Sequence, residues 1–432
     1  MEMPPSAEAP SSAVRVLPLT PFTPDLYERA WCSVPHPTLP LIATAYGKSV
    51  RIFSLSSLSS HSTLTGGHTR SIRSVAWKPN LPPHQLCLVT GSFDSTAGLW
   101  RWDGELPFVG GDAASSAAEP LEIDLGGAAK RRPSGDGDSD GDKDWEFTLV
   151  LEGHDSEIKG VSFAPSGVYL ATCSRDQTAW VWEDVGATEG DDEWETVAVL
   201  NEHNGDMKGV AWCPDVPGRN SRRRYSADVL ASASYDNTIR IWREDGDGEW
   251  VCVAVLEGHD ATVWGVQWEQ TPRDDGGFPR LLSYSADQTI RIWSLQAEDE
   301  NEDEDDGPGA AFRGGLGGIP NTMRRSLRED WVCTAVLPKV HTRDIYSATW
   351  SATSGMVAST GSDSVIAPLE PPAGSGRWRV VAEVPNAHGP YEINHITWCK
   401  RYDAGSENKG VEEMLVTTGD EGLVKPWQVV VS

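Results

Sequence analysis

Six histidine–carboxylate pairs recur along the chain, and an imidazole beside a carboxylate is an arrangement that acid–base catalysis and many metal sites use. The histidines are His68, His154, His203, His259, His341 and His388, and the carboxylates that follow them are Asp94, Asp176, Asp236, Asp287, Asp363 and Glu421. Catalysis rarely needs six identical sites. The repetition therefore favours a structural role, a buried hydrogen-bond network that joins the histidine turn to the aspartate turn through a hydroxyl, such as that of Thr172 or Ser232, and a tryptophan indole.

The elements that must position these pairs are short strands. Residues 170–183 alternate up to Ser174, bend at Arg175-Asp176, and continue with β-branched and aromatic residues to Trp182, which predicts two strands around a tight turn. The same pattern follows the other histidines, with Leu369 in the tryptophan position of one unit. A period of about 40 to 45 residues with Gly-His and Trp marks is typical of a β-propeller.

A seventh, weaker unit at 27–53 completes the count, with Gly47 in place of the aspartate and Phe53 in place of the tryptophan. We expect an all-β, seven-bladed WD40 propeller that the N-terminal strand at 13–19 closes by pairing with the last blade. The expected organisation is a disordered stretch at 1–12 and one propeller over 13–432. Acidic and glycine-rich insertions at 103–144 and 297–330 should leave the face opposite the Gly-His turns.

Composition limits the classes of partner. The net charge of −28 argues against nonspecific binding to nucleic acid or to an acidic membrane, because either requires a basic face. The seven cysteines form no C-x-x-C pair, which favours a reducing compartment, and no apolar run is long enough to span a membrane. Arg222-Arg223-Arg224 and the acidic run 298–306 are predicted to be solvated loops. We expect a soluble intracellular protein.

One face of the predicted ring gathers a cationic and aromatic patch. Arg175 precedes the turn aspartate and should point toward the Gly-His face, as should Tyr235 in the next blade. A second ring comes from the residue that follows the first apolar position of each inner strand: Arg73, Lys159, Lys208, Trp264, Tyr346 and Asn394. These residues are either solvated rim charges or a site that captures a carboxylate or an acidic and aromatic peptide.

Three stretches carry a family resemblance: 170–183, 230–236 and 250–264. They resemble the WD40-repeat proteins of cytosolic iron-sulfur protein assembly. The resemblance implies a non-enzymatic scaffold, present in the cytoplasm and also in the nucleus. No cofactor or metal is expected, because the cysteines are not clustered as the ligands of an iron-sulfur cluster would be. It further implies a small assembly factor, a HEAT-repeat adaptor, a hydrogenase-like cluster carrier and client apoproteins as partners. The exposed functional arginine of the family maps onto Arg175.

The sequence is also compatible with two other functions, and one blade departs from the family pattern. The same patch would suit a substrate receptor of a ubiquitin ligase or a chromatin peptide reader. An enzyme with a metal in the channel would require inward-facing histidines or carboxylates that the structural network leaves free. Blade six departs from the family pattern, because Pro368 lies in its third strand and removes a hydrogen-bond donor there, so this blade is expected to be irregular or shortened.

Overall fold

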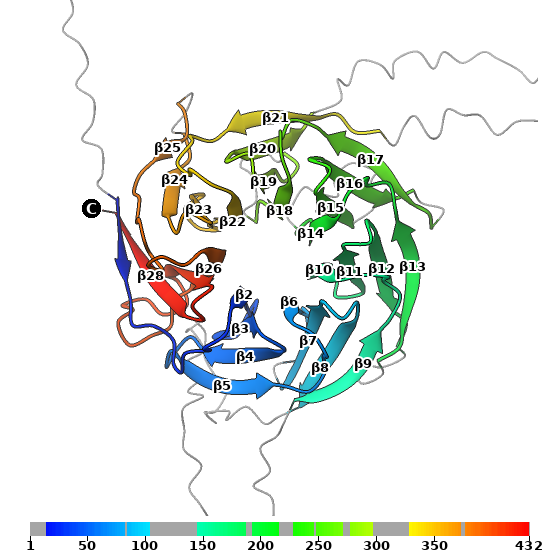
Figure 1. Ribbon diagram of the computed structural model, residues 1–432, viewed down its shortest axis with the longest axis horizontal. Helices are drawn as coiled ribbons and strands as arrows, with labels where there is room; N and C mark the ends of the chain where they lie inside the picture. The colour runs from blue at the N-terminus through cyan, green and yellow to red at the C-terminus, as the bar shows by residue number, and fades with distance from the viewer. Residues whose placement is uncertain are drawn as a thin grey trace, which may run out of the picture.

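The computed structural model describes residues 14–82, 84–103, 145–186, 192–215, 228–245, 248–270, 277–296, 328–372 and 376–431. Seven four-stranded antiparallel sheets stand around a central channel, which confirms the predicted propeller (Figure 1). The expected disorder at 1–12, most of both acidic insertions and the run Arg222-Arg223-Arg224 lie outside the described residues. Within the described ranges, no helix is long and apolar enough to cross a membrane.

The blades follow one another in chain order, each from its innermost to its outermost strand. Blade one consists of β2 (Ala30–Pro35), β3 (Leu41–Tyr46), β4 (Ser49–Ser54) and β5 (Ser59–Leu64). Blade two consists of β6 (Ile72–Trp77), β7 (Gln85–Ser92), β8 (Ala97–Asp103) and β9 (Glu146–Leu151). Blade three consists of β10 (Ile158–Phe163), β11 (Tyr169–Ser174), β12 (Ala179–Asp184) and β13 (Trp194–Leu200). Blade four consists of β14 (Met207–Trp212), β15 (Val229–Ser234), β16 (Ile239–Glu244) and β17 (Trp250–Leu256).

The other three blades complete the ring. Blade five consists of β18 (Val263–Trp268), β19 (Leu281–Ser285), β20 (Ile290–Leu295) and β21 (Trp331–Val336). Blade six consists of β22 (Ile345–Trp350), β23 (Val357–Gly361), β24 (Ile366–Glu370) and β25 (Arg379–Val380). Blade seven consists of β26 (Ile393–Lys400), β27 (Glu413–Gly419), β28 (Val424–Val431) and, as its outermost strand, β1 (Val14–Pro18).

The N-terminal strand closes the ring as the sequence predicts. β1 pairs antiparallel with β28, from Val14 opposite Val431 to Pro18 opposite Trp427 (Figure 1). The amide of Leu19 extends the ladder by donating to the carbonyl of Pro426 at 2.9 Å. The last blade is therefore built from both ends of the chain, and the edge of β28 is covered.

Blade six is shortened at its outer strand. β25 has two residues, whereas the outer strands of blades two to five have six or seven. Pro368 lies in β24 opposite Ala358 and still accepts a hydrogen bond from the amide of Val381. Beyond this point the pairing continues as one bridge between Ile366 and Val384. The expected irregularity is thus present, mainly in the fourth strand.

The hydrophobic core lies between neighbouring blades. Val89 of β7, for example, belongs to the same buried cluster as Ile158 and Val161 of β10 in the next blade. At the face opposite the Gly-His turns, an aromatic ring near the start of the outer strand packs on the ring that ends the inner strand of the same blade in blades two to six. These pairs are Trp77–Trp145, Phe163–Trp194, Trp212–Trp250, Trp268–Trp331 and Trp350–Trp378, with centroids 5.4 to 6.2 Å apart.

Candidate partner-binding site

The repeated histidines and carboxylates form buried hydrogen-bonded groups in blades two to seven. In blade three, Nδ1 of His154 lies 2.8 Å from Asp176, and Nε2 lies 2.8 Å from the hydroxyl of Thr172, which also accepts the indole N–H of Trp182 at 3.0 Å. The other histidine–carboxylate pairs are His68–Asp94, His203–Asp236, His259–Asp287, His341–Asp363 and His388–Glu421. Blade six lacks the indole because Leu369 takes its place.

This environment holds the aspartates ionised. Burial by itself would raise the pKa of Asp176, but hydrogen bonds from His154 and Thr178 outweigh it and lower the pKa to about 2. The six histidine side chains are at most 1% exposed. Neither a substrate nor a metal ion has access to imidazoles that are covered and already bonded. The described part of the chain contains no group of three or more metal-ligating side chains.

A β-bulge in every blade sets the residues that line the channel mouth. In each pairing of a first with a second strand, the register skips one residue, for example between Ile158 and Gly160. The skipped residues are Trp31, Arg73, Lys159, Lys208, Trp264, Tyr346 and Asn394. A bulged residue is released from the ladder, and bulges often redirect side chains next to binding sites. All seven skipped residues line one pocket of about 290 Å³.

The structure brings together five of the predicted partner-binding residues and places the other two beside them. Arg73, Lys159, Lys208, Trp264 and Tyr346 line the pocket, which we call the channel mouth. Arg175 and Tyr235 lie farther out on the same face and are exposed, the Arg175 side chain to 58%. Tyr235 adjoins the mouth because the ammonium of Lys208 lies 5.5 Å from its ring centroid and 5.6 Å from that of Trp264.

Carboxylates neutralise most of the cations around the mouth, which corrects the description of this patch as cationic. Glu157 lies 2.9 Å from the ammonium of Lys159 and 3.6 Å from the guanidinium of Arg175. Asp206 lies 3.4 Å from Lys208 and 3.8 Å from Arg175. The hydrogen bond from Lys159 lowers the pKa of Glu157, so this acid stays ionised. The surface is better described as charge-balanced and aromatic.

Arg73 is the exception among these cations. Within the described residues no carboxylate lies within ion-pair distance of it, and its guanidinium instead stacks 5.1 Å from the ring centroid of Trp31. Burial lowers the pKa of Arg73, because the charged form loses water without gaining a counter-ion. A cation in this position is suited to binding an anionic group that reaches into the mouth.

Several residues of the mouth escape reasoning from the sequence. Trp31 and Arg29 come from blade one, which the sequence does not align with the others because it has no Gly-His turn. Arg29 stacks on Trp31 and pairs with Asp420 at 2.5 Å. The sequence analysis also did not include four acidic residues around the mouth, although their positions in the sequence could have indicated them. Glu157, Asp206, Asp344 and Glu392 each lie two residues before a bulged residue, and positions two apart share one side of a strand.

Comparison with known proteins agrees with this architecture. The family model "WD domain, G-beta repeat" matches residues 58–101, 145–183, 194–243 and 250–294, which fall in blades one to five. A protein of Pyricularia oryzae named "Probable cytosolic iron-sulfur protein assembly protein 1" is 63% identical, over 98% of both chains. The chain belongs to the cytosolic iron-sulfur protein assembly protein 1 family. Proteins of the same name from Neurospora crassa and Chaetomium globosum are 55% and 52% identical, over 98% and 99% of this chain and 97% and 100% of their own.

Membership of the cytosolic iron-sulfur protein assembly protein 1 family extends over parts that the repeat model does not match. Blades six and seven carry no repeat match, yet each is a four-stranded sheet with the same His–carboxylate contact as the matched blades. The suspected family resemblance is thereby confirmed for nearly the whole chain. The roles of individual side chains at the channel mouth remain predictions.

Proposed function

We propose that this protein is a non-enzymatic scaffold of cytosolic iron-sulfur protein assembly. Its identity of 63% over 98% of its length to a relative that bears this name carries the proposal. The fold supports it, because short, tightly bonded turns around the channel offer a rigid docking surface. The proposed partners are a small assembly factor, a HEAT-repeat adaptor, a hydrogenase-like cluster carrier and client apoproteins. The proposed location is the cytoplasm, and also the nucleus.

The proposed docking site comprises the mouth and the adjoining exposed side chains. Trp264 and Tyr346 pack edge to face with centroids 5.2 Å apart and provide a rigid aromatic wall. Arg73 provides a positive charge for a carboxylate, whereas Arg175 reaches solvent at the rim. A peptide with an acidic and an aromatic group fits this combination, since aromatic and arginine side chains contribute much of the energy of protein interfaces.

The experiment is an affinity purification from native cytosol with wild type, Arg175→Glu and Arg73→Leu, followed by mass spectrometry. Arg379→Glu is the matched control for Arg175→Glu, because it makes the same charge change at an arginine that is 60% exposed on the outer strand of blade six. Recovery of iron-sulfur assembly factors and apoproteins, reduced by Arg175→Glu or by Arg73→Leu but not by the control, supports both scaffold and site. Recovery of a ubiquitin-ligase adaptor or histones instead would overturn the proposed function.

A further inference from the structure

The channel mouth carries one positive charge that the chain itself does not neutralise. Four cations line the pocket, and three of them, Arg29, Lys159 and Lys208, have a carboxylate within 2.5 to 3.4 Å. Arg73 is the fourth, and among the described residues no hydrogen-bond acceptor contacts its guanidinium. A guanidinium that has lost water and gained no acceptor is more stable when an anionic group is bound to it.

Two carboxylates on another side of the mouth are uncompensated in the opposite sense. Glu392 lines the pocket and accepts a hydrogen bond from the hydroxyl of Tyr346 at 3.3 Å, and Asp344 accepts one from the indole N–H of Trp264 at 3.3 Å. Within the described part of the chain, no lysine or arginine lies within ion-pair distance of either acid. The two acids directly precede β26 and β22, and β22 lies across the channel from β6, which carries Arg73 (Figure 1).

Both acids are bonded to the aromatic wall of the mouth. Burial and the negative charges of Glu392 and Asp344 raise the pKa of Tyr346 to about 12, so its hydroxyl stays protonated and continues to donate to Glu392. Neutral donors leave the full negative charge on the carboxylates. A lysine or arginine side chain that enters here gains from these charges and from aromatic rings, which attract cations.

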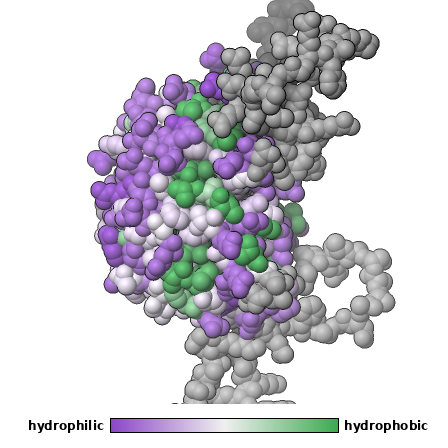
Figure 2. Space-filling view, turned by 90° about the vertical axis from the view of Figure 1, so that its right-hand side faces the viewer, coloured by the Kyte–Doolittle hydropathy of each residue, from purple (hydrophilic) through white to green (hydrophobic). Residues whose placement is uncertain are grey.

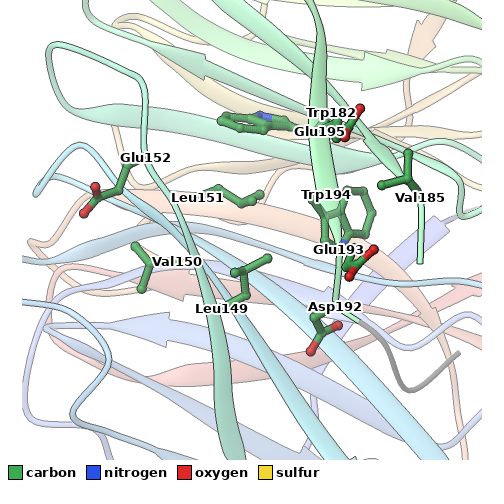
Figure 3. A pocket seen from close by; sticks show the side chains of 10 residues that line it. All are labelled: Leu149, Val150, Leu151, Glu152, Trp182, Val185, Asp192, Glu193, Trp194 and Glu195. Atoms are coloured by element: carbon green, nitrogen blue, oxygen red, sulfur yellow. The ribbon is translucent and has the colours of Figure 1, made fainter. Parts of the chain in front are cut away.

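The hollow on the side of the ring lacks this combination of charges. It has a volume of about 540 Å³ and lies beside β9 and the start of β13, where Asp192 pairs with Arg101 at 2.6 Å (Figure 3). Four acidic residues, and neither lysine nor arginine, are among the described residues that line it. The side of the ring shows small apolar patches separated by hydrophilic surface (Figure 2). Of these two hollows, the mouth is the one that brings unpaired charges of opposite sign together.

We propose that the channel mouth binds a partner segment that presents one acidic and one basic side chain, the acid at Arg73 and the base at Glu392 and Asp344. This inference rests on the docking role proposed for the mouth, and it adds the direction in which the segment lies across the channel. The pocket of about 290 Å³ is small, so it admits few side chains. A segment with acids alone or bases alone leaves one charged side of the mouth unpaired and binds more weakly.

The test selects random octapeptides displayed on phage against the full chain, in parallel with Arg73→Leu, Glu392→Gln and a control. The control is Glu257→Gln, which removes the same charge at an exposed position before the Gly-His turn of blade five. We expect wild type and control to enrich peptides that contain both an acidic and a basic residue. Glu392→Gln should lose the enrichment of basic residues alone, and Arg73→Leu that of acidic residues alone.

Three results of the selection would overturn the proposal. The first is enrichment of acidic residues without basic ones by wild type, and the second is no enrichment at all. The third is the same enrichment of basic residues by wild type and Glu392→Gln, because that would assign the basic preference to the overall negative charge of the chain.

A synthetic copy of the most enriched octapeptide then permits a double-mutant cycle by surface plasmon resonance. Replacing its basic residue with glutamine should weaken binding to wild type about tenfold, but binding to Glu392→Gln less than about twofold, because the charge that it pairs with is already absent. Asp344→Asn removes the other carboxylate and should also reduce the effect, which keeps the cycle informative if Glu392→Gln impairs folding. Equal losses in wild type and both variants would refute the basic half of the site.

Purification from cytosol separates this inference from the proposed function. Recovery of iron-sulfur assembly factors that falls with both Arg73→Leu and Glu392→Gln, but not with Glu257→Gln, supports the two-sided mouth. Recovery that falls with Arg73→Leu and is unchanged in Glu392→Gln would overturn the two-sided mouth and leave the scaffold in place.

Discussion

The strongest quantitative prediction concerns the buried aspartate of blade three. Asp176 accepts hydrogen bonds from the amide of Asp155 at 3.0 Å and from the amide and hydroxyl of Thr178 at 2.9 and 2.6 Å, and it faces His154. In Asp176→Asn one acceptor oxygen becomes an N–H donor that faces other donors. We therefore expect the substitution to lower the free energy of unfolding.

The size of the effect follows from the pKa of Asp176, which falls from its usual 3.8 to about 2. Each pKa unit corresponds to about 1.4 kcal/mol, so ionisation of this group contributes about 2 kcal/mol to stability at neutral pH. Because the pKa is lower in the folded state, the contribution is complete above about pH 5 and is lost as the pH falls toward 2. The difference between wild type and Asp176→Asn should therefore be about 2 kcal/mol at pH 7 and about half of that near pH 3.

The assay is urea unfolding followed by tryptophan fluorescence at both pH values, with sulfate in the buffer to favour the folded state at low pH. Asp155→Asn serves as the control, because its side chain is exposed and it should change stability by less than about 0.5 kcal/mol. A loss for Asp176→Asn that is equally large at both pH values would show that the contribution does not come from the ionised carboxylate. A loss no larger than that of the control would refute the network as a source of stability.

Three further predictions concern the exposed rim, a buried ion pair and ring closure. Arg175→Glu should change the free energy of unfolding by less than about 1 kcal/mol, because its ion pairs are long and its side chain is mostly exposed; a larger loss in urea unfolding would make it structural. Arg243→Met should cost about 3 kcal/mol because it removes the guanidinium that pairs with the buried carboxylate of Glu329, and adding Glu329→Gln should restore much of this loss in a double-mutant cycle. Removal of residues 1–18 should lower the melting temperature and increase light scattering, since it exposes the edge of β28; an unchanged melting curve would contradict closure by β1.

The sequence predicts the blades because their local signals agree with one another. The turn aspartates, the tryptophan positions and the alternation of residues 170–183 all indicate the same four-stranded unit, and the structure has that unit seven times. Counting from the first apolar position of each inner strand predicts six of the seven bulged residues at the mouth, all except Trp31 of blade one. The residues that blade one contributes to the mouth were not predicted, because Gly47 replaces the turn aspartate and Phe53 replaces the tryptophan in this blade. The extent of the disordered N-terminus and of the insertions stays a prediction.

Tertiary structure decides what the sequence pattern leaves open, because strand pattern alone does not measure distances between blades. Whether Lys159 and Lys208 act as free cations depends on Glu157 and Asp206, which the bulges bring within 2.9 to 3.4 Å of them. The periodic pattern of single strands therefore determined the propeller by itself, whereas the charge balance of the mouth depends on packing between blades.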